Sequence, residues 1–277
     1  MSGGERADTA LSILAAAREA PDRPALIAGD RVVRYEELAG SVRSALGWIA
    51  RRLDATEAAR AEPSPLRPAP VALVARRIPE TLHLLLALLE LGIPAAMIHA
   101  RLTARERSAM EGLLRPVLTV DPAALDEVEE ELSGQPPTAG IDPESILAVV
   151  PTSGSSGRPK AVLLSRRAFL ASARASAANL GWDEEDRWLA PLPLAHVGGL
   201  SIPLRTLIAR RCTVLAPPGA FDPAAIVRQI ERHRVTLVSL VPPMLEALLS
   251  RLGLSRSLMV NNDSLAAFRA GTTEPYG

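Results

Sequence analysis

The segment Pro151-Thr152-Ser153-Gly154-Ser155-Ser156-Gly157-Arg158-Pro159-Lys160 lies between two short apolar runs, at 146–150 and 161–164. Apolar runs of this length that are bounded by glycine and proline predict buried strands. The segment between them is rich in glycine and hydroxyl groups. It is therefore predicted to be a flexible loop that joins two strands.

Lys160, at the end of this loop, is the only lysine among the 31 lysine and arginine residues of the chain. Exposed arginine and lysine are often interchangeable, but at a phosphate site the compact ammonium of lysine differs from the planar guanidinium of arginine. A lysine placed at random among the basic positions would fall here in roughly 1 case in 31, so this exception to an arginine-rich composition marks the loop as a candidate site.

The chemistry of the loop suits an anionic phosphate chain. Its consecutive backbone amides can point inward, and its hydroxyl and ammonium donors add charge-assisted hydrogen bonds. It is not a Walker A loop, which has glycine where Pro159 stands, nor a dinucleotide-binding fingerprint, which needs glycine at Ser156. These residues alone leave two interpretations open, a phosphate-binding loop and a solvent-exposed linker.

Apolar runs alternate with amphipathic segments along most of the chain. Strands that alternate with helices imply crossover units, so we predict an α/β fold with a largely parallel sheet. The expected helices begin at cap residues such as Thr103, Ser165 and Asp222. Strands are expected at 24–27, 32–35, 71–75, 94–99, 146–150, 161–164, 187–190, 212–215 and 235–241, and helices at 36–53, 79–91, 103–114, 166–179, 200–209, 223–233 and 243–252.

Changes in this pattern suggest a division of the chain. Residues 1–140 are expected to form a first α/β subdomain that contains a proline-rich loop at 55–70. Residues 141–254 are expected to form a second α/β subdomain that carries the glycine-rich loop. No amphipathic period continues after Gly253, so residues 255–277 are expected to be an irregular tail.

Composition excludes several classes of protein. The formal net charge is zero and no basic block is present, so nucleic acid is not an expected partner. The longest apolar segment, 82–91, is interrupted by His83 and Glu90 and is too short to span a bilayer. No signal peptide is visible, and the one cysteine, Cys212, starts an apolar run. A cytoplasmic protein without disulfide bonds is therefore expected, with Cys212 as a small core residue.

Residues 152–162 resemble the signature loop of the AMP-forming acyl-CoA synthetases and related adenylate-forming enzymes. This family usually has threonine at Ser156 and glycine at Ala161; Ser156 keeps the hydroxyl group, and Ala161 adds one methyl group. Segments 25–38, 91–103 and 191–200 agree with the family in order and spacing. The resemblance covers residues 20–250. Within it, segment 200–205 is most similar to the o-succinylbenzoate–CoA ligases of menaquinone biosynthesis.

The resemblance implies the N-terminal domain of the adenylate-forming fold, with largely parallel sheets flanked by helices. Such enzymes join a carboxylic acid to the α-phosphate of ATP in the presence of Mg²⁺, and then transfer the acyl group to coenzyme A. Lys160 would take part in catalysis by balancing the charge of the leaving pyrophosphate, or would tether the loop electrostatically. Phosphate oxygens would be held by the hydroxyl groups of Thr152, Ser153, Ser155 and Ser156 and by the backbone amides of Gly154 and Gly157.

The resemblance also implies an acyl site in segment 191–200. His196 would lie beside the carboxylate of the acid and orient it, and Gly198 and Gly199 would form a wall that lets the substrate approach the backbone. The alternatives are a loop histidine with ordinary hydrogen bonds and a simple glycine turn. No metal-ligating residues are predicted. The remaining histidines lack ligand spacing and are expected to have structural roles: His83, His99 and His233.

The family's later motifs, for adenine, ribose and magnesium, are not recognisable, and its second catalytic lysine is absent because Lys160 is the sole lysine. The sequence thus indicates an incomplete, truncated and inactive acid–CoA ligase that lacks the mobile C-terminal domain. The alternative is a non-catalytic protein that binds a nucleotide or an acyl ligand. A third class, the P-loop phosphotransferases, conflicts with Pro159. The sequence does not indicate an oligomeric state.

Overall fold

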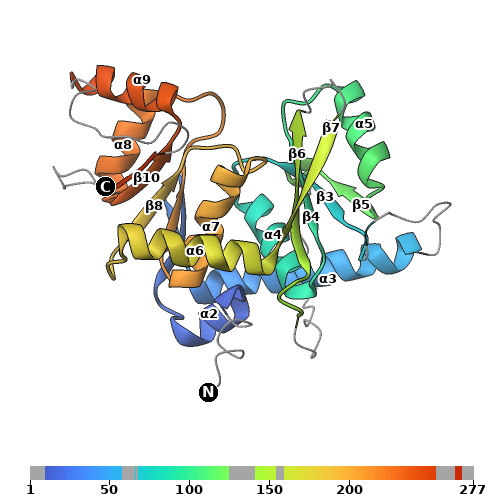
Figure 1. Cartoon of the computed structure of the whole chain (residues 1–277). Coiled ribbons are helices and arrows are strands. Elements are labelled where there is room, and N and C mark those ends of the chain that lie inside the picture. The colour runs from blue at the N-terminus through green and yellow to red at the C-terminus, as the bar shows by residue number, and fades with distance from the viewer. Residues whose placement is uncertain are drawn as a thin grey trace.

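The computed structural model describes residues 10–57, 66, 68–124, 141–153, 159–253 and 266–269. Strands and helices alternate along most of these residues, as the sequence predicts (Figure 1). The elements are, in chain order, α2 (Ile13–Glu19), β1 (Pro24–Ala28), β2 (Arg31–Arg34), α3 (Tyr35–Glu57), β3 (Val71–Ala75), α4 (Pro79–Leu91), β4 (Ala95–His99), α5 (Ala104–Leu114), β5 (Leu118–Val120), a 3₁₀ helix (Pro122–Ala124), β6 (Ile146–Ser153), β7 (Pro159–Ser165), α6 (Arg166–Leu180), β8 (Arg187–Ala190), α7 (Val197–Ala209), β9 (Cys212–Leu215), α8 (Pro223–His233), β10 (Leu237–Leu240), α9 (Pro242–Leu252) and β11 (Ala266–Arg269).

The strands form two separate sheets (Figure 1). The first has the strand order β11-β10-β8-β9-β1-β2, and its three inner pairs are parallel. The second has the order β5-β3-β4-β6-β7 and is parallel except for the antiparallel pair of β6 and β7. The predicted α/β fold with largely parallel sheets flanked by helices is confirmed.

Each sheet is covered by helices on both faces. The side chains of successive strand residues point to opposite faces. In β3, Leu73 belongs to the large core shared with α4, whereas Ala72 packs with Met110 of α5 on the other face. In β8, Trp188 faces the shared core and Leu189 packs with residues of α8 and α9. The result is a layered structure in which α4 and α7 lie between the two sheets (Figure 1).

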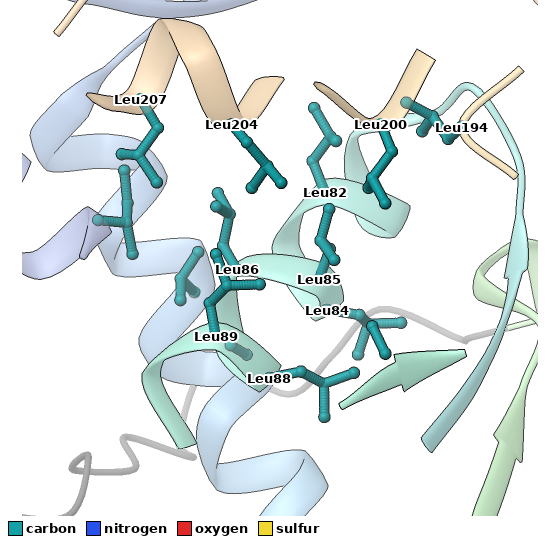
Figure 2. Packing of buried hydrophobic residues seen from close by; sticks show 14 of the residues in the cluster. Leu82, Leu84, Leu85, Leu86, Leu88, Leu89, Leu194, Leu200, Leu204 and Leu207 are labelled. Carbon is teal, nitrogen blue, oxygen red and sulfur yellow. The ribbon is translucent and has the colours of Figure 1, made fainter. Parts of the chain in front are cut away.

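The layer between the sheets depends on leucine packing. α4 is buried on almost all sides, as expected of a helix with apolar residues around its whole circumference. Figure 2 shows leucines of α4 and α7 directed into one cluster, and this cluster includes Leu194 from the loop before α7. The labelled members are Leu82, Leu84, Leu85, Leu86, Leu88 and Leu89 of α4 and Leu200, Leu204 and Leu207 of α7.

Local capping signals are confirmed. The side chains and backbones of Thr103 and Glu106 form the expected capping box at the start of α5. The side chain of Ser165 accepts a hydrogen bond at the start of α6, and that of Asp222 does so at the start of α8. These caps satisfy backbone amides that the first helical turn leaves free, so the short polar residues set where the helices begin.

The sheets do not follow the subdomain boundary expected at residue 140. β1 and β2 join β8, β9 and β10 in the first sheet, and β6 and β7 join β3, β4 and β5 in the second. Sheet neighbours are set by crossover connections rather than by sequence order, so chain position alone did not predict them. The tail is also not irregular throughout, because β11 pairs antiparallel with β10.

Two helices differ from the expected ones in where they begin or end. α3 extends to Glu57, so the first residues of the expected proline-rich loop are helical, and most of the remainder of that loop lies outside the described residues. α7 begins at Val197, three residues before the expected start, and therefore includes both glycines of that segment.

Cys212 is buried, and burial raises the pKa of its thiol to about 12, in agreement with a core residue. Among the described residues no helix is long and apolar enough to cross a membrane.

A buried carboxylate joins α4 to the beginning of α2. Glu90 is 7% exposed, and its Oε1 accepts hydrogen bonds from the hydroxyl of Ser12 at 2.9 Å and from the backbone amide of Leu14 at 3.2 Å. Ser12 is the N-cap residue of α2, and its Oγ in turn accepts a hydrogen bond from the amide of Ala15 at 3.0 Å. The negative charge thus lies at the positive end of a helix dipole, where it is stabilising.

Replacing Glu90 with alanine is expected to lower the free energy of unfolding by about 1–3 kcal/mol, the cost of leaving buried donors without an acceptor. Glu90→Gln keeps a carbonyl oxygen at the same position and should lose less. Urea denaturation of both variants measures the difference. Equal losses would contradict a contribution from hydrogen bonds to this side chain.

Candidate functional site

Two histidines from different layers meet at one edge of the molecule. His99 is the last residue of β4, and His196 is the N-cap residue of α7, shortly after β8. Their ring centroids are 5.4 Å apart, and the ring planes are inclined at 49°. His99 is half-buried and His196 is exposed, so the pair lines a surface that solvent can reach.

Arg77 holds the carboxyl edges of the two sheets together beside this pair. It follows β3 and donates hydrogen bonds to the carbonyl oxygen of Pro191, after β8, and to those of Pro217 and Gly219, after β9, the last two at 2.8 Å each. Burial and, to a smaller extent, the charge of Arg101 lower the pKa of the Arg77 guanidinium. In open α/β sheets, ligands bind outside the carboxyl ends of the strands, which makes this edge the candidate site.

The proton on the His99 ring can be assigned from its hydrogen bond. The backbone amide of Arg101 donates to Nδ1 of His99 at 3.0 Å. A ring nitrogen that accepts a hydrogen bond carries no proton, so the neutral ring has its proton on Nε2. Burial, followed by the positive charges of His196 and Arg101, lowers the pKa of His99. At physiological pH His99 therefore presents an N–H donor rather than a charged imidazolium.

The glycine-rich loop leaves the second sheet at this same edge. β6 and β7 form a hairpin whose last two pairs are Thr152 with Lys160 and Ser153 with Pro159. β4 and β6 are parallel neighbours, so the carboxyl end of β6 and the carboxyl end of β4 at His99 belong to one edge. The element after the loop is the strand β7, as the sequence predicts.

The predicted phosphate-binding residues are described only in part. The structure gives the backbone of Thr152 and Ser153 in β6 and the whole of Lys160 in β7, whose side chain is exposed. Their roles at a phosphate chain stay predictions. The remaining predicted residues lie outside the described part of the chain: Gly154, Ser155, Ser156 and Gly157.

The glycines after His196 lie in the first turn of α7 and not in an irregular turn. Gly199 is buried, and a Cβ atom built there would lie 2.7 Å from the backbone carbon of Pro193 and 2.8 Å from the backbone oxygen of Leu192. Only glycine allows the helix to pack so closely on the loop that leads to His196. Gly198 is half-buried beside it. The role of both glycines at an acyl site stays a prediction.

His99 is a residue of the candidate site that its sequence context did not reveal. A structural role was predicted for it together with His83 and His233, because the histidines show no common spacing. In the structure His83 lies in α4 and His233 ends α8, whereas His99 faces His196. Its position directly after a fully apolar run of strand residues was the available signal, because strand ends in parallel sheets line binding sites. Among the described residues no group of three or more His, Cys, Asp or Glu side chains could hold a metal ion.

Gly199→Ala is expected to destabilise the protein by about 1–3 kcal/mol, because the added methyl group has no room against a backbone that cannot move aside. Gly40→Ala in α3 is the matched control. Gly40 has nothing within 4 Å of its built Cβ, and alanine there should be neutral or stabilising. Thermal unfolding compares the two variants. Unchanged stability of Gly199→Ala would contradict the close packing.

Comparison with known proteins gives consistent results. The curated 2-succinylbenzoate–CoA ligase of Bacillus pumilus is 32% identical over 247 residues, which are 84% of this chain and 48% of that protein. The corresponding ligase of Enterococcus faecalis is 35% identical over 168 residues, which are 61% of this chain and 34% of that protein. The chain thus spans about half the length, or less, of these curated relatives.

Solved structures agree with the sequence matches. The o-succinylbenzoate CoA synthetase of Bacillus subtilis in complex with its acyl-adenylate intermediate is 27% identical, with a TM-score of 0.70 over 86% of this chain and 63% of that chain. The same enzyme in complex with ATP and a magnesium ion gives a TM-score of 0.70 over 50% of that chain. A family model described as AMP-binding enzyme matches residues 13–271. This chain therefore belongs to the AMP-binding enzyme family.

Proposed function

We propose that this chain carries the N-terminal part of an AMP-forming acid–CoA ligase that acts on 2-succinylbenzoate. Such a ligase makes an acyl-adenylate from the acid and ATP and then transfers the acyl group to coenzyme A. The proposal is supported by the match to the AMP-binding enzyme family and by the shared name of the curated relatives. Because ATP and coenzyme A are its substrates, the proposed reaction would occur in the cytoplasm. Its acid substrate would place it in the pathway to menaquinone.

The observation that supports it best is the shared edge of the site. The hairpin loop after β6 and the residue before α7, His196, are separated in sequence, yet both lie at the carboxyl edges that Arg77 ties together. A phosphate-binding loop and an acid-orienting histidine must be close neighbours, because the carboxylate oxygen attacks the α-phosphate directly. The parallel pairing of β4 with β6 and the contact between the rings of His99 and His196 support such a proximity.

The residues of this chain would act mainly by binding the phosphate chain of ATP and by orienting the carboxylic acid. Hydroxyl and amide donors of the loop at 152–157 would hold the phosphate oxygens, and Lys160 would balance the charge that grows on the leaving pyrophosphate. His196 would donate a hydrogen bond to the acid carboxylate and direct one of its oxygens toward the phosphorus. Gly198 and Gly199, in the turn that follows, would let the acyl group approach the backbone of α7.

A magnesium ion would be held mainly by the nucleotide. The described residues contain no cluster of three or more carboxylate, imidazole or thiolate ligands, and Mg²⁺ is commonly bound through substrate phosphates and one or two carboxylates. When bound, the ion neutralises part of the charge on the triphosphate. The loop donors and Lys160 would supply the remaining positive electrostatic potential from the protein side.

Lys160→Ala is expected to weaken the binding of MgATP and of magnesium pyrophosphate by the same factor, roughly tenfold, as for the loss of one charge-assisted hydrogen bond. The melting temperature should change little, because the side chain is exposed. Arg174→Ala removes a comparable exposed cation from α6 and is the control. Titration calorimetry measures both ligands, and equal losses for the two variants would contradict a specific role of Lys160.

The isolated 277-residue polypeptide is expected to form no acyl-CoA, because it spans only about half the length of its relatives and contains a single lysine. A coupled assay with 2-succinylbenzoate, MgATP and coenzyme A tests this expectation, with a full-length relative as the positive control. Formation of the thioester by the purified chain would contradict this expectation, because it would show that the residues of this chain are sufficient for catalysis.

A further inference from the structure

We propose that His99 is a second carboxylate-binding residue of the acyl site and that it holds the acid together with His196. This inference rests on the proposed function and adds a residue to it. It assigns the Nε2–H group of His99 as a hydrogen bond donor to an oxygen of the substrate carboxylate. The acid would then be held between a residue of the second sheet and a residue that follows the first.

The pairing of β4 with its neighbouring strands fixes the position of His99. β4 is a central strand of its sheet, paired with β3 on one side and β6 on the other, and His99 lies opposite Ala75 in the last pair with β3. The four residues of β4 that precede His99 are all fully buried. A binding residue at the end of such a strand is held by the packed core rather than by a mobile loop.

The hydrogen bond from the Arg101 amide fixes the ring of His99 as well as its proton. With Nδ1 occupied at 3.0 Å, only Nε2 is left to bind another group. Within the described part of the chain, no residue accepts a hydrogen bond from this Nε2. This Nε2 is not one of the buried side-chain nitrogens that lack a partner in the described residues, so it reaches solvent and can donate to a ligand that enters the site.

The charges around His99 favour an anionic ligand. The two charged groups that act on its ring are His196 and Arg101, and both are cationic when protonated. Besides Arg101, Arg77 adds a positive charge at the same edge, and its guanidinium is engaged by three carbonyl oxygens, which carry no net charge. The carboxylate of Asp121, directly after β5 in the same sheet, is paired with Arg76 at 2.7 Å. A carboxylate that enters between the two histidines therefore meets a net positive potential.

Histidine NMR tests the proposal directly on the 277-residue chain. Long-range ¹H–¹⁵N spectra report the tautomer of each ring, and His99 is expected to show a protonated Nε2 before ligand is added. Titration with 2-succinylbenzoate should then shift the Nε2 signals of His99 and His196. The dimethyl ester of the same acid lacks both negative charges and should shift neither signal. Single histidine-to-asparagine variants assign the four ring systems.

Substitutions separate binding from structure. His99→Asn keeps an oxygen to accept from the Arg101 amide and an N–H donor, so its dissociation constant for the acid should stay within about twofold of the wild type. His99→Leu has neither group and should weaken binding about fivefold or more, as for the loss of a hydrogen bond to a charged group. His83→Leu in α4 is the control for removing a histidine elsewhere, and circular dichroism confirms the folding of each variant.

The outcomes distinguish this inference from the proposed function. If the acid binds but neither shifts the His99 signal nor loses affinity in His99→Leu, the role of His99 is wrong and the proposed function stands. If MgATP binds and the acid does not, both the role of His99 and the acyl half of the proposed function are wrong. If neither ligand binds to the wild-type chain, the proposed function itself fails.

Discussion

The packing of α4 against α7 between the two sheets is the constraint on which the site depends. Each buried leucine in this layer contributes about 1.5–3 kcal/mol through the removal of apolar surface from water. Leucine is the most frequent residue of this layer, and Figure 2 shows leucine side chains of both helices in one cluster. Leucines that fill a close-packed layer leave little freedom for one sheet to shift against the other. The relative position of the two carboxyl edges is therefore set deep in the core.

At the surface, this constraint brings together polar residues that no sequence spacing connects. His99 comes from the end of a strand in one sheet, and His196 from the helix that follows a strand in the other. Arg77 completes the arrangement, because its planar guanidinium reaches three carbonyl oxygens at once, which a lysine could not do in the same geometry. The core thus fixes the distance between the sheets, and Arg77 secures the edge at which a ligand would enter.

Much of the fold followed from local patterns. The alternation of apolar and amphipathic segments predicted most elements, and short polar residues such as Thr103, Ser165 and Asp222 marked where helices begin, because they cap free backbone amides. The distribution of strands between two sheets could not be predicted in this way. It depends on which strand each crossover returns to, and that is decided by packing between distant segments.

The same distinction between local sequence patterns and long-range packing applies to the residues of the candidate site. The loop at 151–160 is contiguous, so its glycine and hydroxyl pattern and the isolated Lys160 mark it in the sequence as a candidate phosphate site. His99 has no such neighbours in sequence, and only the fold brings its ring to 5.4 Å from that of His196. Gly199 shows the reverse case: the sequence suggested contact with a substrate, and the structure adds a packing reason for glycine against the backbone of Pro193.

We propose that the joined carboxyl edges of the two sheets form an acyl-adenylate site. A crystal structure of the chain with a non-hydrolysable adenylate analogue of 2-succinylbenzoate tests it most directly. We expect the phosphate group to lie against the loop at 152–160, and the acyl carbonyl, which derives from the carboxylate, to lie between His99 and His196. An analogue bound at any other surface, or no bound analogue at a concentration that saturates a full-length relative, would contradict it.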